Sequence, residues 1–254
     1  MHRLWLLVGS FLTVAALGFA TFNVVSVMAH EEMTVDATFP AAGLSSVRLD
    51  TESGRVEIVG DDVEEITLVA EISHGIRRTG HEATVDGDTL VVRSDCPTLP
   101  TVWCRVAYRL VVPGDLASDV HTDDGRLILR DLRGDVRADG DSGSVVLARL
   151  SGDVDASTDD GSVRATGLGG ATVAARSTHG AVRLSFADAP TAVTARTSDG
   201  AVEVVVPDDD ATYRVDVDNF VGSTDTAIRI DPGSDRSITA TTDNGSVTVR
   251  YPTG

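Results

Sequence analysis

Hydrophobic and polar residues alternate along most of the chain after residue 44, as expected for β-strands that bury one face. Helical periodicity is missing from this part of the sequence, so we predict an all-β fold. In the middle of the chain, the alternating segments are interrupted by a glycine every nine residues, at Gly125, Gly134, Gly143, Gly152, Gly161 and Gly170.

At a fixed offset from every second glycine, the residues belong to the same class. A meander of hairpins does not require such a repeat. Two residues after these glycines stand Leu127, Val145, Val163, Val182 and Val202, and four residues after them Leu129, Leu147, Ala165, Leu184 and Val204. The intervening half-repeats carry Val136, Val154, Val173 and Val193, then Ala138, Ala156, Ala175 and Ala195. Equivalent segments are about 18 to 20 residues apart. We therefore predict a single-stranded parallel β-helix, or β-solenoid, with two short strands in each coil.

The alternate glycines are expected at the corners of the coils, because glycine tolerates positive φ and turn-forming residues precede it. These preceding residues are Asp124, Ser142, Asp160, His179, Asp199 and Asn244. Gly54 and Gly245 stand in the same context. The repeat is therefore predicted over nearly the whole body of the protein.

A segment of 26 residues without a charge, Leu4 to Ala29, precedes the repeat. As a helix that rises about 1.5 Å per residue, it exceeds the roughly 30 Å of a bilayer core, so we expect one transmembrane helix. Arg3 precedes the segment, and Glu31 and Glu32 follow it. This favours a single-pass protein of the cell membrane with its C-terminal domain outside the cytoplasm. The alternatives are a cleaved signal peptide, which would make the protein secreted, and a buried core helix.

These patterns divide the chain into three parts. We expect a transmembrane anchor or signal segment at residues 1–29, a tether at residues 30–43, and a β-solenoid repeat domain at residues 44–254. The regular core of that domain should span about residues 120–207. Irregular sequence follows the core, and a final strand pair ending near residue 250 is expected to cap the stack.

Cys96 and Cys104 are the two cysteines of the chain and are separated by seven residues. In an oxidising compartment outside the cytoplasm, such a pair usually forms a disulfide. Two free thiols and a metal site are the alternatives, although a metal site would need further ligands at suitable spacing.

The chain is strongly acidic, with 39 acidic residues against 21 basic ones and a net charge of −18. Such a surface repels phosphate backbones, so we expect no nucleic-acid partner. Asp123, Asp141 and Asp159 should form a column at the corners, where calcium could relieve their mutual repulsion. Solvated turn aspartates are the competing interpretation. Across coils, we expect one ion pair between Arg137 and Asp155 and another between Arg183 and Glu203.

No residue is predicted to be catalytic, and no cofactor is expected. The string GDSG around Ser142 matches the surroundings of a serine-protease nucleophile, but that mechanism needs a histidine base and a buried aspartate. The repeat already explains Ser142 as a corner residue. His121 and His179 are interpreted in the same way, as solvated structural histidines.

The units DDGSV and SDGAV, the single N-terminal apolar span, and the cysteine pair leading into VAYRLVVPGD resemble the bacterial "putative adhesin" family of β-strand-repeat envelope proteins. The resemblance covers about residues 45–250 and rests on structural repeats. It implies a β-solenoid at the cell envelope, and no catalytic residues accompany it.

The leading hypothesis is a non-enzymatic, membrane-anchored extracytoplasmic domain with a surface, adhesion or envelope-scaffold role. It would bind the membrane through Leu4 to Ala29, and another envelope protein or further copies of itself through its outer faces. One alternative is an exported β-helix enzyme that acts on polysaccharide. Another is an ectodomain that senses the state of the envelope through a partner protein.

Overall fold

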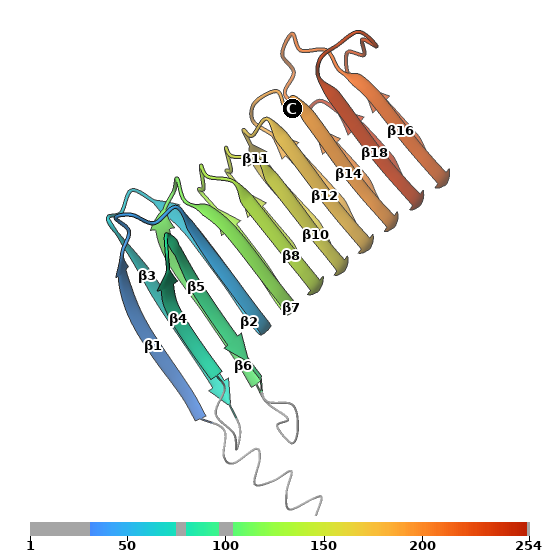
Figure 1. Ribbon diagram of the computed structural model, residues 1–254. Helices are drawn as coiled ribbons and strands as arrows, with labels where there is room; N and C mark the ends of the chain where they lie inside the picture. Colours follow the sequence, from blue (N-terminus) through green and yellow to red (C-terminus); the bar gives the residue numbers. More distant parts are fainter. Residues whose placement is uncertain (1–30, 75–79, 97–103, 253–254) are drawn as a thin grey trace, which may run out of the picture.

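The computed structural model describes residues 31–74, 80–96 and 104–252, and the regular structure in them consists of β-strands alone. The strands stack into one elongated body (Figure 1). No helix among these residues is long and apolar enough to cross a membrane. The expected transmembrane segment at residues 1–29 lies outside the described residues.

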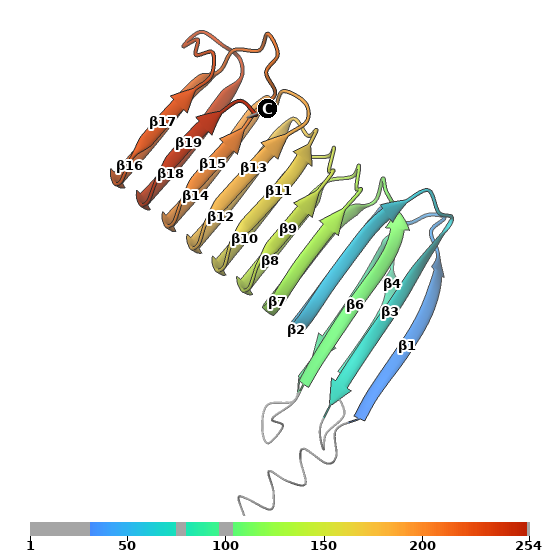
Figure 2. The ribbon, with the colours of Figure 1, turned by 180° about the vertical axis from the view of Figure 1, so that it is seen from behind.

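Each coil contributes one strand to each of two walls, and neighbouring strands of the regular core run parallel within each wall. The first wall (Figure 1) contains the first half of β7 (Ala117–Arg130), then β8 (Val136–Ser142), β10 (Val154–Asp160), β12 (Thr172–His179) and β14 (Ala192–Asp199). The second wall (Figure 2) contains the second half of β7, then β9 (Val145–Ala148), β11 (Val163–Leu168), β13 (Val182–Phe186) and β15 (Val202–Val205). The predicted all-β solenoid with parallel strands is confirmed for this core.

Side chains that point between the walls form columns of like residues along the stack. Val145 pairs with Leu127 on one side and with Val163 on the other, as the fixed sequence offsets predict. The alanine column is also in register from coil to coil and consists of Ala138, Ala156, Ala175, Ala195 and Ala240. All of these residues are buried. Burial of apolar surface, worth about 25 cal/mol per Å², therefore stabilises each coil against the next.

Stacked glycines form the corner between the two walls. Gly143 has a φ of 142°, and a Cβ atom added to it would lie 1.6 Å from the backbone oxygen of Gly125 in the preceding coil. At the opposite corner, a Cβ atom added to Gly152 would lie 2.3 Å from the backbone oxygen of Gly134. Both corners exclude a side chain, so the nine-residue spacing of glycine corresponds to half a coil.

Buried hydroxyl groups support the glycine corner from inside the stack. Thr158 donates a hydrogen bond to the carbonyl oxygen of Gly143 (2.9 Å), and Thr197 donates one to that of Gly180 (2.7 Å). Ser177 and Thr242 make the corresponding hydrogen bonds to the carbonyl oxygens of Gly161 and Gly200. These bonds satisfy backbone carbonyl groups that the close approach of the coils removes from water.

The segment expected as a tether, residues 30–43, contains a strand instead. β1 (Glu31–Pro40) pairs antiparallel with β3 (Glu65–His74) over its whole length. The tether prediction is wrong because Val35, Ala37 and Phe39 alternate with exposed residues and pack against the core. The burial of these three side chains ties the segment to the sheet.

An antiparallel N-terminal cap replaces the predicted coils over much of residues 31–113. It comprises β1, β3, β4 (Gly80–Asp86), β5 (Thr89–Asp95) and β6 (Cys104–Pro113). β3 pairs antiparallel with both β1 and β6, and β4 pairs antiparallel with β5. The prediction of a solenoid from residue 44 is therefore wrong for this part of the chain. Long alternating strands fit either arrangement, and the sequence here lacks the regular glycine spacing.

β2 (Ser46–Asp61) forms a complete coil between the N-terminal cap and the regular core. Its first half pairs in parallel with β5 and β7, and its second half pairs in parallel with β6 and β7. The cap strands β5 and β6 therefore lie on one side of this coil and β7 lies on the other.

The last two coils are stacked in the reverse of their sequence order. β18 (Ser237–Asn244) pairs with β14, and β19 (Val247–Arg250) pairs with β15. β16 (Arg214–Val221) and β17 (Thr224–Ala227) lie outside them as a terminal coil (Figures 1 and 2). The prediction that the final strand pair caps the stack is wrong. Ile238 and Ala240 continue the buried columns, whereas Val215 and Val217 of the terminal coil are only half-buried.

Candidate binding surfaces

The three aspartates predicted as a cation-binding column lie beside the glycine corner on successive coils. Asp123 forms an ion pair with His121, with 3.1 Å between Oδ1 and Nε2, and Asp159 accepts a hydrogen bond from Thr178 (3.1 Å). Asp141 is exposed. The part of the chain that the structure describes contains no group of three or more His, Cys, Asp or Glu side chains that could hold a metal ion. The structure therefore stacks these aspartates without gathering them around a common centre.

Ser142 and His179 occupy the corner column, as the repeat predicts. Ser142 lies in register between Asp124 and Asp160. The Nδ1 atom of His179 lies 3.0 Å from Oδ1 of Asp160, and its Nε2 atom lies 3.7 Å from Oδ2 of Asp199. The column neighbours of Ser142 are thus carboxylates, which do not supply the histidine base of a serine protease.

Charged side chains on the outer faces pair along the coils and across them. Arg183 approaches Glu203 as expected, with 3.8 Å between Nε and Oε2. Arg137 lies in register with Asp155, but its Nε atom pairs with Asp139 in its own strand (3.0 Å). The expected partner of Arg137 is therefore wrong, because the side chain reaches a carboxylate two residues away more directly. Exposed pairs of this kind contribute at most about 1 kcal/mol each.

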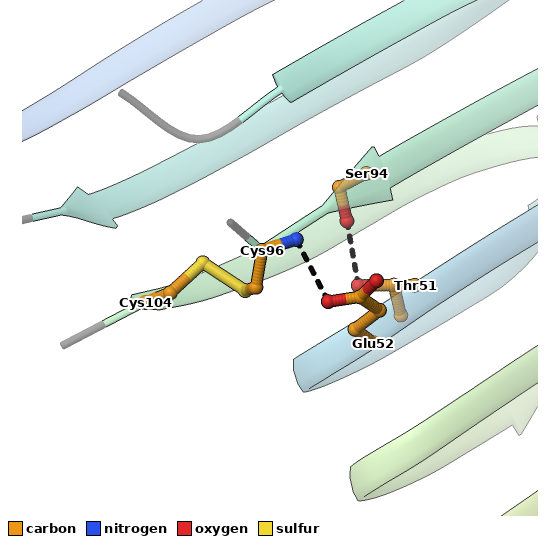
Figure 3. Close-up of a disulfide and its surroundings, with 5 residues drawn as sticks. All are labelled: Thr51, Glu52, Ser94, Cys96 and Cys104. Carbon is orange, nitrogen blue, oxygen red and sulfur yellow. Dashed lines mark hydrogen bonds between the residues drawn. A yellow bond between two sulfur atoms is a disulfide. The ribbon is translucent and has the colours of Figure 1, made fainter. Parts of the chain in front are cut away.

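Cys96 and Cys104 are joined by a disulfide at the outer corner of the N-terminal cap (Figure 3). Their Cα atoms are 5.8 Å apart, and the bond links the end of β5 to the start of β6. β5 pairs with the first half of β2, and β6 pairs with its second half. The disulfide therefore lies beside the corner at Gly54, where the two halves of β2 meet. The carboxylate of Glu52 accepts a hydrogen bond from the backbone N–H of Cys96 (2.8 Å). Of the three states that the sequence left open, a disulfide, two free thiols and a metal site, the structure contains the disulfide.

Two buried tyrosines, Tyr108 and Tyr213, belong to the core, and the half-buried His81 contacts the first of them. The hydroxyl of Tyr108 lies 2.9 Å from Nδ1 of His81, and burial raises the pKa of Tyr108 and lowers the pKa of His81. Burial also raises the pKa of Tyr213 to about 12, and its hydroxyl has no hydrogen-bond partner among the described residues. Burial disfavours the charged form of the side chain in all three cases.

A groove of about 500 Å³ crosses the outer face of the first wall near the starts of β2, β7, β8, β10 and β12. Arg48, Asp119, Arg137 and Asp155 follow one another in an outward column along it. Arg48 pairs with Asp119, with 3.1 Å between Nε and Oδ2. Because the charges alternate, the column carries little net charge.

A second hollow, of about 300 Å³, lies on the outer face of the second wall over β11, β13, β15 and β19. Arg164, Arg183, Glu203 and Arg250 line it, and we call these four residues the arginine pocket. The Nε and Nη2 atoms of Arg250 donate hydrogen bonds to Glu203, at 3.2 and 2.7 Å. The pocket thus places three guanidinium groups around one carboxylate in a strongly acidic protein.

Sequence analysis found only the pair formed by Arg183 and Glu203. Arg164 could have been found by the same signal, because all three residues stand three positions after a corner glycine. Arg250 could not have been placed, because it reaches the pocket only through the reversed order of the last two coils.

The terminal coil has an open edge. Among the described strands, β16 pairs only with β18, and β17 pairs only with β19. Phe220 is 87% exposed and Val221 is 55% exposed. Asp216, Asp218 and Asp225 are exposed on the same coil. The edge therefore combines free strand edges, large apolar side chains and negative charge.

The stacked parallel coils match a known protein family. The family described as Toastrack DUF4097 matches residues 117–253. The chain belongs to this family. The match begins at the first residue of β7, so the Toastrack region comprises the parallel coils, and β2 and the N-terminal cap precede it. The resemblance to a family of β-strand-repeat proteins is confirmed over residues 117–253. No curated protein matches the Toastrack chain.

Solved structures with similarity to this Toastrack protein include three bacterial proteins. A "putative cell adhesion protein" from Clostridium sporogenes ATCC 15579 is 9% identical, with 87% of this chain and 100% of that chain covered and a TM-score of 0.43. A "putative adhesin" from Bacteroides fragilis NCTC 9343 is 13% identical, with 87% and 97% covered and a TM-score of 0.49. A "putative adhesin" from Parabacteroides distasonis ATCC 8503 is 12% identical, with 87% and 97% covered and a TM-score of 0.27. At these values, no functional argument is drawn from the similarity.

Proposed function

We propose that this Toastrack protein is a non-enzymatic, membrane-tethered domain outside the cytoplasm that serves a surface, adhesion or envelope-scaffold role through its terminal coil. The observation that carries this proposal is the difference between the two ends of the stack. At both ends the outer strands have one partner each among the described strands, β1 and β4 in the N-terminal cap and β16 and β17 in the terminal coil (Figure 1). The terminal coil differs because its edge carries a strongly exposed aromatic side chain, Phe220, beside several aspartates. β1 directly follows the expected anchor, so the open edge would face away from the membrane.

The chemistry of the open edge favours an extended, basic segment of another envelope protein as its partner. A free strand edge binds an added strand through main-chain hydrogen bonds. Asp216, Asp218 and Asp225 would attract basic side chains on that strand. A second copy is disfavoured, because it would bring either the same aspartates or the acidic residues Glu82 and Asp86 of β4 at its other end.

The positions of carboxylates and aromatic side chains relative to the two hollows support the non-enzymatic part of the proposal. An enzyme that cleaves polysaccharide needs a pair of carboxyl groups on opposite sides of the scissile bond. In the groove of the first wall, Asp119 is engaged by Arg48. Asp135 and Asp153 also line this groove, and each accepts a hydrogen bond from a backbone N–H of the next coil, at 3.0 and 2.9 Å. Phe220 is a strongly exposed aromatic side chain, but it lies on the terminal coil, away from both hollows.

Cross-linking in intact cells tests the proposal. The tagged full-length protein is compared with Asp216→Lys/Asp218→Lys, which reverses the charge of the open edge. We expect a defined envelope protein to be cross-linked to the unaltered protein and lost from the variant. A sensory ectodomain would give the same loss with a partner that itself crosses the membrane.

Asp123→Lys/Asp141→Lys is the matched control, because it makes the same change in charge beside the corner in the middle of the stack. This control should retain the cross-linked protein. Equal capture by both charge-reversal variants, cross-linking only to further copies of this chain, or recovery of bulk cell-wall material alone would overturn the proposed partner.

A further inference from the structure

We propose that the arginine pocket binds a phosphate group carried by a component of the cell envelope. This site lies on the second wall over β11, β13, β15 and β19. The proposal does not depend on the open edge of the terminal coil, so each can fail without the other.

Two arginines stand side by side in the pocket without enough negative charge to balance them. Arg164 and Arg183 are directly opposed on the neighbouring parallel strands β11 and β13, whose backbones are about 4.8 Å apart. Like charges in such opposed positions destabilise a sheet. Arg164 forms no ion pair with any residue that the structure describes, and the contact of Arg183 with Glu203 is long, at 3.8 Å.

The single acid of the pocket is already engaged by another arginine. Glu203 accepts two hydrogen bonds from Arg250, at 3.2 and 2.7 Å, and this pairing neutralises both side chains. Arg164 and Arg183 therefore leave an excess of about two positive charges on a protein whose net charge is −18. The local excess is opposite in sign to the charge of the whole molecule, so it would select an anion that the rest of the surface repels.

A phosphate group matches the charge and the donors of this pocket. A phosphate monoester carries about −1.5 to −2 charges at neutral pH, and each phosphodiester group of a polymer carries about −1. Guanidinium groups bind phosphate oxygens in a bidentate manner. Thr166 and Ser185 also line the pocket and add two hydroxyl donors. One arginine suffices for a carboxylate, whereas two arginines and two hydroxyls suit the larger number of oxygens on phosphate. The pocket is open to solvent, so the phosphate can belong to a larger molecule.

Titration with inorganic phosphate tests the site directly. The folded protein is titrated at constant ionic strength, with sodium chloride as the balancing salt, and the chemical shifts of amide groups are followed by NMR. We expect saturable shifts confined to β11, β13 and their neighbours. Arg164→Gln/Arg183→Gln should weaken phosphate binding at least tenfold, and Glu203→Gln should strengthen it several-fold by removing the competing carboxylate.

Arg109→Gln is the matched control, because Arg109 is exposed on β6 of the same wall, outside the pocket, and is in register with Glu57 of β2 rather than with another arginine. Its phosphate affinity should not change. If the double variant fails to fold, Arg164→Gln alone makes the test, because this side chain has no ion pair to lose. Shifts that follow ionic strength alone, or acetate binding as tightly as phosphate, would overturn the proposal.

The source of the phosphate is distinguished by two further probes. Co-sedimentation with phosphatidylcholine vesicles that contain phosphatidic acid would point to a lipid headgroup. Preferential binding of soluble poly(glycerol phosphate) would point to an envelope polymer. In either case, the binding should disappear in the Arg164→Gln/Arg183→Gln variant, and its persistence there would count against the pocket.

Discussion

The two ends of the stack differ in how they cover the last coil. At the N-terminal end, β5 and β6 pair in parallel with β2 and antiparallel with β4 and β3, and a disulfide links β5 to β6. The buried hydroxyl of Tyr108 has a hydrogen-bond partner there. At the C-terminal end, a parallel coil is left with an open edge, and the buried hydroxyl of Tyr213 has no partner among the described residues. A stacked repeat always leaves its last unit with one uncovered face. The comparison teaches that both ends keep free strand edges, and that they differ in strand direction, in the disulfide and in the side chains they expose.

The largest expected change in the free energy of unfolding comes from replacing a corner glycine by alanine. We compare a corner in the middle of the stack with the corner of the terminal coil. Gly143→Ala would place Cβ 1.6 Å from the oxygen of Gly125, with coils packed on both sides. We expect it to lower the free energy of unfolding by more than about 3 kcal/mol. In Gly222→Ala, the added Cβ atom would lie 1.7 Å from the oxygen of Gly245. The terminal coil has a single neighbouring coil and can shift, so the free energy of unfolding should fall by less.

Chemical denaturation measures both effects. Gly140→Ala is the control, because its Cβ would have no neighbouring atom closer than 3.8 Å, and its effect should be slight. Equal losses for Gly143→Ala and Gly222→Ala would show that the terminal coil is held as firmly as the core.

The next effect concerns the N-terminal cap. Cys96→Ser/Cys104→Ser removes the link between β5 and β6, and the entropic model predicts a loss of about 2 to 3 kcal/mol for so short a loop. Hydrogen exchange should speed up in β5 and β6 and stay unchanged in β14, because neighbouring coils transmit stability only locally. Faster exchange throughout the molecule would instead mean that the cap and the coils unfold as one unit.

The two buried tyrosines give a smaller and opposite pair of effects. Tyr108→Phe should cost about 1 kcal/mol, because it removes the hydrogen bond with His81. Tyr213→Phe should be neutral or stabilising, because it removes a buried hydroxyl that has no partner among the described residues. Thermal unfolding of both variants measures the difference, and a clear loss of stability in Tyr213→Phe would contradict it.

Tyr213 also makes stability depend on alkaline pH. Its pKa is raised to about 12 in the folded protein, above the value of about 10 in an unfolded chain. The folded state therefore favours the neutral form, and this contribution is complete below pH 10 and is lost as the pH rises toward 12. The Tyr213→Phe variant should show a shallower fall in the free energy of unfolding over this range.

The smallest effect compares two buried threonines on the first wall. Thr197→Val removes the hydrogen bond to the carbonyl oxygen of Gly180 (2.7 Å) and should cost about 1 kcal/mol. Thr122 lies closer to the N-terminal cap, and its buried hydroxyl has no partner among the described residues, so Thr122→Val should be neutral or stabilising. Equal losses in a denaturation experiment would show that the hydroxyls act through packing rather than through the glycine corner.

The arginine pocket was only partly predictable from the sequence. Arg183 and Glu203 stand at the same offset from successive corner glycines, and this offset alone places them side by side. The same rule applies to Arg164. The charge balance of the pocket was not predictable, because it depends on Arg250 pairing with Glu203.

The sequence by itself determined the coils and their corners, because alternating burial and the glycine offsets are properties of short segments that repeat along the chain. Leu127, Val145 and Val163 stack as their offsets require. Only the tertiary structure decided how the ends are closed and in which order the last coils stack. Residues 214–227 and 237–250 can both form a coil, and the choice between them depends on which fills the buried columns better against β14 and β15. That competition is between segments distant in the chain, so no local pattern records its outcome.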